Sequence, residues 1–168
     1  MMTHFEKVSE RQFNKDWQKV FGVAPGGNVY ASIVLPRRAT RYDAGYDFFA
    51  PVDVTLGPGE TILIPTGIRA IMDFDQFLML VPRSGLGFKF RMQFDNTVGI
   101  VDSQYSKSDN EGHIMAKITN DTKEFRTCRL ERGQAFMQGI LLHYDTMDDE
   151  DATTKERNGG FGSTDADN

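Results

Sequence analysis

The stretch Asn96-Thr-Val-Gly-Ile-Val-Asp102-Ser-Gln-Tyr105 decides how the rest of the sequence is interpreted. Its run of small and branched apolar residues is typical of a β-strand, and the Ser-Gln pair after Asp102 favours a turn. A strand-turn-strand of this kind forms a slot with free backbone groups at its edge, an aromatic ring as a wall and a carboxylate at its mouth. The alternative is an ordinary hairpin with Asp102 capping the turn and Tyr105 half-buried, because most short apolar runs carry no chemistry.

Composition narrows the class of protein. The 168 residues fit one domain, and 13 Phe residues within a hydrophobic share of 39% supply its core. No apolar run reaches the ~20 residues of a membrane span, and the N-terminus lacks a signal-peptide pattern. The lone Cys128 cannot form an intramolecular disulfide, so we expect a cytoplasmic protein. A net charge of −5 argues against nucleic-acid binding, and three scattered His residues give no zinc-ligand spacing.

The chain divides into three predicted regions. Residues 1–28 are predicted to form an attached helix, which begins with a capping box at Ser9-Glu-Arg-Gln12 and ends at Gly22. Residues 29–144 are predicted to form an all-β barrel or sandwich, because short apolar runs alternate with Gly, Pro, Asn and Asp clusters. Residues 145–168 are predicted to form an acidic connector and a Gly-rich end, which is either a tail or an arm that orders on a ligand.

Two of these regions carry detailed expectations. The helix presents an apolar stripe of Phe13, Trp17, Val20 and Phe21, which is predicted to pack on its own domain or on a second copy of the chain. Besides the run before Asp102, the predicted strands are 29–35, 60–65, 67–72, 77–81, 113–119 and 134–143.

Two segments have the character of anion-binding sites. Pro82-Arg-Ser-Gly-Leu-Gly-Phe-Lys89 places Ser84 as the cap of a short helix beside Arg83, where backbone N–H groups favour an anion. Arg157-Asn-Gly-Gly-Phe-Gly-Ser-Thr164 offers open backbone donors, and Phe161 among its glycines suggests a lid that stacks on something flat. It lacks the Gly-Lys-Ser/Thr ending of a P-loop. The alternatives are a plain helix cap and a floppy terminus.

Two further polar positions are weaker signals. In Arg41-Tyr-Asp-Ala-Gly-Tyr-Asp47 the two Asp residues either face a hydrated Mg²⁺ or cap turns. Gln138 is a polar side chain in an apolar run, so it either satisfies a neighbour or faces a site. Cleavage of a phosphoanhydride requires groups that bind the phosphates, position the substrate and activate a water molecule. The segments above offer these parts: an anion cradle, a second phosphate grip, a slot for a flat ring and a carboxylate able to activate water.

The order of these segments resembles the five motifs of the trimeric deoxyuridine triphosphatases (dUTPases). The matching segments are Ala44–Asp47, Pro82–Gly87, Asn96–Tyr105, Gly133–Gln138 and Gly159–Thr164. The resemblance implies a jelly-roll β-barrel with an N-terminal helical extension, assembled as a homotrimer whose active sites take segments from three subunits. It implies Mg²⁺-dependent hydrolysis of dUTP to dUMP and pyrophosphate, which keeps uracil out of DNA and supplies dUMP for thymidylate synthesis.

The same resemblance implies a role for each candidate residue. Asp102 is the expected base for water, and Tyr105 is the ring under the deoxyribose that leaves no room for a 2′-hydroxyl. Gln138 is expected at the α-phosphate or the water, and Asp47 at Mg²⁺ through water. Uracil is expected to bind to Asn96 and the backbone of Gly99, Ile100 and Val101. The phosphate contacts and the closing arm are expected from Arg83, Ser84, Gly85, Arg157, Phe161, Gly162, Ser163 and Thr164.

The sequence departs from the family pattern at several points. Gln104 replaces an acidic or small residue, and Gln134-Ala135 replaces a common Asp-Arg pair. The hairpin after Tyr105 is longer at 106–112, which leaves the alignment of Met115 to its far side open. The last motif is one residue short after Arg157, so the placement of that residue is open too.

Two other functions remain to be weighed. A related fold hosts dCTP deaminases, which use a Glu to activate water, but no Glu precedes the slot here. A binding or regulatory protein is the second alternative, in which the N-terminal helix or the long hairpin recruits a partner protein. That alternative is favoured only if the apolar stripe of the helix is exposed.

Overall fold

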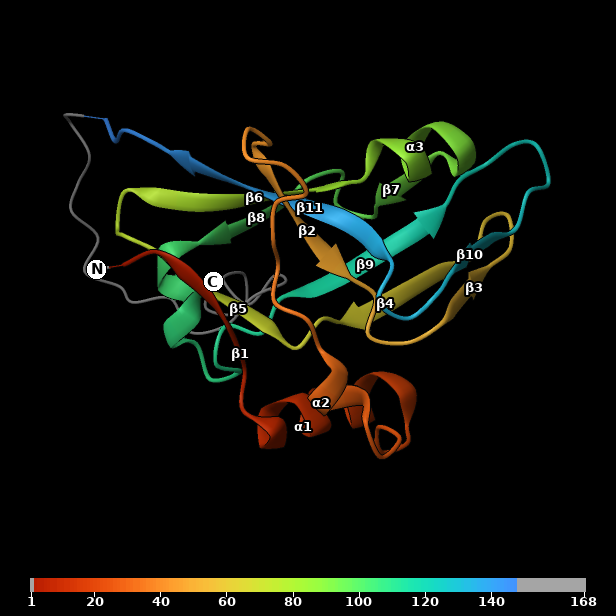
Figure 1. Cartoon of the computed structure of the whole chain (residues 1–168), viewed down its shortest axis with the longest axis horizontal. Helices are drawn as coiled ribbons and strands as arrows, with labels where there is room; N and C mark the ends of the chain where they lie inside the picture. Colours follow the sequence, from red (N-terminus) through yellow and green to blue (C-terminus); the bar gives the residue numbers. More distant parts are fainter. Residues whose placement is uncertain (1, 148–168) are drawn as a thin grey trace, which may run out of the picture.

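The computed structural model describes residues 2–147 of the 168-residue chain, and antiparallel strands are the main regular elements of that part (Figure 1). The strands are β1 (His4–Lys7), β2 (Gly45–Phe49), β3 (Val54–Leu56), β4 (Thr61–Pro65), β5 (Ile68–Ile71), β6 (Gln76–Pro82), β7 (Met92–Phe94), β8 (Gly99–Asp102), β9 (Met115–Asn120), β10 (Cys128–Leu130) and β11 (Ala135–His143). The helices are α1 (Glu10–Phe21), α2 (Val29–Ser32), α3 (Ser84–Phe90) and the 3-10 helix η1 (Ser103–Lys107).

The described strands pair into two main sheets and two smaller pairs. The larger sheet has four strands in the order β2-β11-β6-β8, and the other has three in the order β4-β9-β7. The smaller pairs are β1-β5 and β10-β3, and every pairing is antiparallel. The predicted all-β class is therefore confirmed, although the strands between residues 2 and 147 do not close into one continuous barrel.

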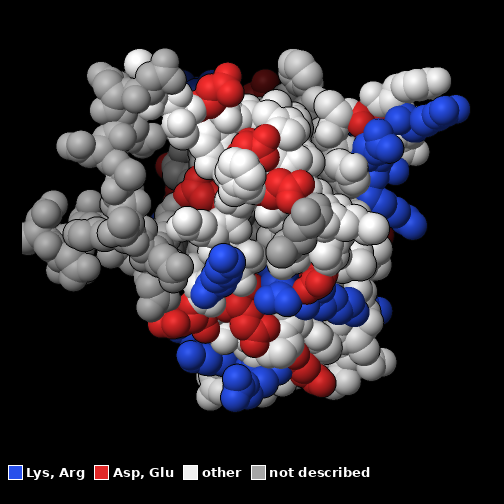
Figure 2. All heavy atoms as spheres, turned by 90° about the vertical axis from the view of Figure 1, so that its left-hand side faces the viewer, with Lys and Arg blue, Asp and Glu red and all other residues white. Residues whose placement is uncertain are grey.

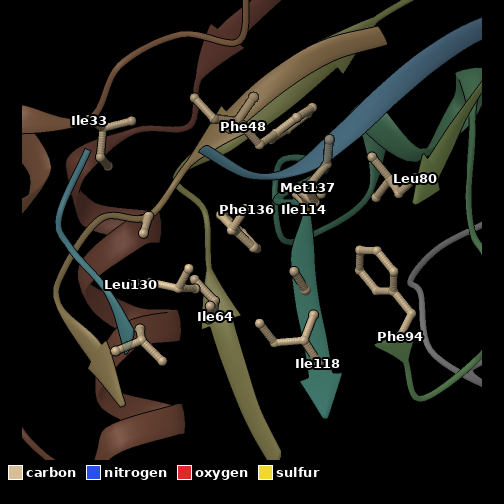
Figure 3. Packing of buried hydrophobic residues seen from close by; sticks show 14 of the residues in the cluster. Ile33, Phe48, Ile64, Leu80, Phe94, Ile114, Ile118, Leu130, Phe136 and Met137 are labelled. Carbon is tan, nitrogen blue, oxygen red and sulfur yellow. The ribbon is translucent and has the colours of Figure 1, made fainter. Parts of the chain in front are cut away.

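The hydrophobic core joins the two main sheets. Phe48 of β2 and Met137 of β11 belong to one buried cluster with Ile118 of β9 (Figure 3). A register shift between Ala135 and Met137 forms a β-bulge, so that the consecutive residues Phe136 and Met137 are both buried. Each side chain of this size contributes about 1.5–3 kcal/mol when it is fully buried. The core therefore holds β11 firmly between its two neighbours.

Helix α1 begins and ends where the sequence predicts. Ser9 is its N-cap, and the Ser9 hydroxyl accepts a hydrogen bond of 3.1 Å from the backbone N–H of Gln12. The acidic partner of the cap is Glu111, whose carboxylate accepts from both the N–H and the hydroxyl of Ser9 at 2.7 Å. Gly22, in the left-handed conformation with φ 72°, ends the helix. The cap of α1 is thus completed by a residue far along the chain.

The apolar stripe of α1 packs on its own chain. Phe13 is fully buried and Trp17 is 7% exposed, with their ring centroids 5.4 Å apart. Phe13 also contacts Tyr30 of α2, with a centroid distance of 5.7 Å. Figure 1 shows α1 and α2 together at the bottom of the view, below the strands. The prediction of a packed stripe is therefore confirmed.

Three expectations about the first 50 residues were wrong or incomplete. The predicted strand 29–35 is wrong, because Val29–Ser32 is α2. Contacts that are distant in sequence hold this turn: the Tyr30 hydroxyl donates to the backbone oxygen of Val8 at 2.7 Å. The sequence also gave no sign of β1, which pairs with β5, or of β2, which begins at Gly45 within a segment expected to turn.

The predicted hairpin beyond Asp102 is also wrong. β8 pairs with β6 in the four-stranded sheet, whereas β9, which begins at Met115, pairs with β4 and β7 in the other sheet. The connection consists of η1 and the turns of residues 108–112. A one-turn 3-10 helix has no apolar periodicity long enough to be recognised in a sequence.

The described part of the chain contains no helix that is long and apolar enough to cross a membrane. On the face drawn in Figure 2, acidic side chains lie beside basic ones, and the described residues there form no continuous basic surface. The charge on that face is therefore mixed in sign.

The packing of α1 predicts a large effect of truncating Phe13. We expect Phe13→Ala to lower the free energy of unfolding by about 3–5 kcal/mol, because it leaves a cavity beneath the helix. Phe74 is 86% exposed, so Phe74→Ala should change it by less than about 0.5 kcal/mol. Urea denaturation at a fixed protein concentration measures both. Equal losses in the two variants would contradict the packing described here.

Candidate active site

A pocket of about 280 Å³ lies at one end of the four-stranded sheet and unites three of the residues singled out by the sequence. These are Asp47 of β2, Gln138 of β11 and Arg83 directly after β6. The pocket is lined by Ala39, Asp43, Ala44, Gly45, Asp47, Arg83, Gln138 and Ile140. Three segments that are far apart in the sequence therefore meet in one cavity.

Strand register brings these residues together. Gln138 lies opposite Asp47 on one side and opposite Val81 on the other, because β11 pairs with both β2 and β6. The backbone N–H of Arg83 donates to the oxygen of Phe136 at 3.2 Å, which extends the pairing past the end of β6. The positions of all three side chains are thus set by backbone hydrogen bonds.

Arg83 and Asp47 form an ion pair, with 3.3 Å between Nε of Arg83 and Oδ1 of Asp47. The Asp47 side chain is 11% exposed and that of Arg83 is 41% exposed. A guanidinium has five N–H donors, so this contact leaves further donors for an anion in the pocket. The buried carboxylate orients the guanidinium at the pocket wall.

The second acid of this segment, Asp43, caps a turn. Its carboxylate accepts from the Thr40 N–H at 2.8 Å and from the Thr40 hydroxyl at 2.7 Å. Those two bonds, the hydroxyl first, hold the pKa of Asp43 below its usual value. Asp43 therefore caps a turn, which is one of the two roles left open for the acids of this segment.

Gly45 makes room for Gln138 in the pocket. A Cβ atom at position 45 would overlap with Oε1 of Gln138 and lie 3.1 Å from its Cβ. Glycine is therefore required for the Gln138 side chain to take its present position. The sequence analysis included Gly45 in a motif but gave no reason for it.

The segment after Arg83 forms the short helix that the sequence predicts, but with a different cap. Arg83 is the N-cap of α3, and Ser84 is its first helical residue. The N–H groups of Leu86 and Gly87 bond to the Arg83 oxygen at 3.0 Å, and buried Leu86 anchors the helix. Ser84 and Gly85 are exposed at the start of α3, so their polar groups face solvent rather than the helix.

Asp102 lies away from this pocket. It pairs with Phe77 at one end of β6, whereas Gln138 lies opposite Val81. At about 3.4 Å per residue, these four positions separate the two levels by roughly 13 Å along the strand. Within one chain, the acid and the pocket therefore do not converge.

β8 is an edge strand of its sheet. β6 pairs with one of its sides, and no described strand pairs with the other. Along β8, Gly99 and Val101 are buried whereas Ile100 is 52% exposed. A Cβ at Gly99 would lie 3.0 Å from the Cβ of Leu80, so glycine lets the two strands approach. Asn96 is exposed in the tight turn that leads into the strand.

Tyr105 lies in η1 and is only 6% exposed. Its hydroxyl donates to the backbone oxygen of His113 at 3.0 Å and accepts from Nδ2 of Asn110 at 2.7 Å. Asn110 and His113 could not be predicted from the sequence, because no residue pattern marks loop positions that contact a ring. Met115 begins β9 opposite Pro65, in the other sheet from β8.

The remaining candidates lie outside the described residues. They are Arg157, Phe161, Gly162, Ser163 and Thr164. Within residues 2–147, no group of three or more His, Cys, Asp or Glu side chains is arranged to hold a metal ion.

Comparison with known proteins gives one consistent result. The dUTPase family profile matches residues 31–165. The deoxyuridine 5'-triphosphate nucleotidohydrolase of Lactococcus lactis subsp. lactis is 39% identical over 138 residues, which cover 81% of this chain and 91% of that protein. The crystal structure of a dUTPase from Streptococcus mutans has a TM-score of 0.64 and 29% identity, covering 86% of this chain and 98% of that one. A dUTPase from phage phi11 of S. aureus, with a structural Mg(II) ion, has a TM-score of 0.62 at 18% identity and covers 90% of this chain and 97% of its own.

Gly45 offers a direct test of the pocket geometry. We expect Gly45→Ala to displace the Gln138 side chain, because the new methyl group would occupy the position of its amide oxygen. Gly27→Ala is a matched control, since no atom lies within 4 Å of a Cβ at that position. Crystal structures of the two variants show the outcome. An unmoved Gln138 in Gly45→Ala would refute the steric role of this glycine.

Proposed function

The chain belongs to the dUTPase family and hydrolyses dUTP to dUMP, and on that basis we propose the role of each site residue in the reaction. The observation that carries the proposal is the meeting of Asp47, Arg83 and Gln138 in one pocket. Cleavage between the α- and β-phosphates releases pyrophosphate. This activity keeps uracil out of DNA and supplies dUMP for thymidylate synthesis, and we assign it to the cytoplasm.

Asp102 is the proposed base. It stands at the end of β8 and is half-buried, so its carboxylate can reach a water molecule without being surrounded by solvent. A positioned carboxylate that accepts a proton from attacking water contributes about 10²–10⁴-fold to a rate. In the attack on the α-phosphorus, the water oxygen forms the new P–O bond, and the pyrophosphate oxygen leaves with the electrons of the broken bond.

The pocket of Arg83 and Gln138 is the proposed phosphate site. The guanidinium stabilises negative charge on the phosphate oxygens, and the Gln138 amide contacts the α-phosphate or the attacking water. Exposed Ser84 and Gly85 add a hydroxyl and backbone donors at the start of α3. Asp47 keeps the guanidinium oriented, as their 3.3 Å ion pair indicates.

The edge of β8 is the proposed uracil site. The backbone of Gly99, Ile100 and Val101, together with Asn96, offers donors and acceptors to the flat polar edge of a base. A slot of this kind excludes the 5-methyl group of thymine and leaves the amino group of cytosine without an acceptor. Tyr105, fixed through its hydroxyl, forms the wall under the deoxyribose and leaves no room for a 2′-hydroxyl.

The described residues fit a Mg²⁺ ion that arrives with the substrate. Mg²⁺ keeps several waters and binds through few carboxylates plus phosphate oxygens. No three-residue acidic cluster exists within residues 2–147, and Asp47, engaged with Arg83, can contact such an ion only through water. The ion supplies charge neutralisation on the triphosphate.

We propose that the active site is shared among the chains of a homotrimer. Asp102 and the phosphate pocket lie at different levels of one sheet, whereas the base for the water and the α-phosphate contact must act at the same phosphorus atom, so we expect them to come from different copies. Met115, the first residue of β9 in the other sheet, is a further proposed substrate contact. The arm with Arg157, Phe161, Gly162, Ser163 and Thr164 is proposed to close over uracil and the outer phosphates.

The two alternative functions have less support. The Lactococcus lactis relative reported above is named as a deoxyuridine 5'-triphosphate nucleotidohydrolase and not as a deaminase. Phe13 and Trp17 of the α1 stripe are buried and Val20 and Phe21 are half-buried, so the stripe is not exposed as a partner-binding helix would require.

A nucleotide panel tests the function itself. With Mg²⁺ present, we expect dUTP alone among dUTP, UTP, dCTP and dTTP to be converted, because only its base and sugar fit the slot. Chromatographic separation of dUMP and pyrophosphate measures the reaction. Conversion of dCTP to a uracil nucleotide would support a deaminase instead.

Subunit mixing tests the shared site. Asp102→Asn should bind dUTP but lose about 10²–10⁴-fold in kcat, and Arg83→Ala should raise KM and lower turnover. When the two variants are mixed at equal amounts and reassembled, about a quarter of the sites should receive an intact base and an intact phosphate pocket from different chains. Activity then reappears in the mixture. A mixture no more active than its parents would place both residues in one chain's site.

A further inference from the structure

We propose that helix α1 is a positioning element for Tyr105, and that Asn110 and Asp16 help the enzyme reject a 2′-hydroxyl. The connection runs through residues 108–113, which we call the linking loop. This inference rests on the proposed role of Tyr105 as the wall under the deoxyribose. Tyr105 stacks on the substrate, whereas Asn110 and Asp16 act through Tyr105.

The linking loop holds both sides of the Tyr105 hydroxyl. The hydroxyl donates to the His113 oxygen at 3.0 Å and accepts from Asn110 Nδ2 at 2.7 Å. Asn110 is itself fixed, because its Oδ1 accepts from the Gly112 N–H at 3.1 Å. The phenol can therefore shift only if the loop shifts with it.

The backbone of the loop also lies against η1. Gly112 has φ 73°, and a Cβ there would lie 2.6 Å from Cα of Ser106 and 2.8 Å from the oxygen of Tyr105. No larger residue allows this approach. Glu111, beside it, has φ 59°, which is a strained conformation for a residue with a side chain. Within the loop, the Glu111 N–H donates to the Ser108 oxygen at 2.7 Å, and the Glu111 side chain takes a second support from outside the loop.

The N-terminus of α1 supplies that support. The Glu111 carboxylate accepts from the N–H and the hydroxyl of Ser9, both at 2.7 Å. These bonds, the backbone one first, keep the pKa of Glu111 below its usual value. The helix cap is therefore at the same time the anchor of the linking loop.

A second contact joins the middle of α1 to the end of the loop. His113 is fully buried, and its Nε2 accepts from the Gly67 N–H at 2.8 Å. The ring proton is then on Nδ1, which donates to Oδ2 of Asp16 at 2.6 Å. Burial raises the pKa of Asp16, but the hydrogen bonds from His113 and Gln12 outweigh it and leave that pKa lowered. A charged Asp16 thus orients a neutral imidazole.

The two contacts make α1, the loop and the tyrosine one rigid unit. The Phe13 ring packs on the His113 ring, with 6.0 Å between centroids, which closes the remaining space. A displacement of about 1 Å at a reacting centre can cost 10²-fold in rate. A ring that is free to drop by a similar distance would admit a 2′-hydroxyl. By holding the Tyr105 ring in place, α1 and the linking loop therefore help the enzyme select deoxyribose over ribose.

Asn110→Asp tests this directly, because it keeps the shape and the acceptor for Gly112 but removes the donor to Tyr105. We expect the ratio of kcat/KM for dUTP to that for UTP to fall about tenfold or more. Asn28→Asp makes the same chemical change at an exposed position without a side-chain capping bond, and should leave the ratio unchanged. Trp17, the single tryptophan, reports through its fluorescence that α1 remains docked.

Asp16→Asn is the second variant, and we expect the same loss of selectivity from it. A purely structural role would lower the activity on dUTP and UTP equally, so an unchanged ratio in a folded variant overturns the inference. Failure of both variants to fold would also overturn it, by assigning these contacts to stability alone. If the wild-type protein itself does not prefer dUTP, the proposed function fails instead.

Discussion

The pairing of β11 with both of its neighbours is the constraint on which the site depends. β11 is held between β2 and β6, and this register places Gln138 opposite both Asp47 and Val81. A shift by one residue would turn Gln138 into the core and Met137 out of it. The β-bulge before Met137 locks the register, because it buries two consecutive side chains in one cluster. β11 therefore determines both the packing of the core and the positions of the site residues.

The charges around the site follow from that arrangement. Arg83 is paired with a buried carboxylate yet remains 41% exposed, so it keeps donors that face the pocket. Asp102 ends β8 and lies opposite Phe77, near the start of β6, whereas Arg83 follows the end of β6.

Sequence reasoning found the long elements and the chemistry-bearing motifs, because both depend on local signals. The cap at Ser9, the end at Gly22 and the strands around β4, β6 and β11 are set by residues that lie next to one another. Sequence reasoning failed where contacts between residues far apart in the sequence determine the local structure. Val29–Ser32 is helical because Tyr30 bonds to Val8, and the turn after Tyr105 is held by Asn110. The support for Tyr105 was invisible for the same reason: Asp16 and His113 meet only after the chain has folded.

The cap of α1 has a consequence for how the chain is made. Ser9 and Glu111 are 102 positions apart, and Asp16 and His113 are 97 apart. A chain that emerges from the ribosome with its N-terminus first therefore cannot form either of these contacts until the linking loop has been synthesised. Contacts of such long range form late and slowly. The cap of the newly made helix thus stays incomplete until most of the described chain has been synthesised.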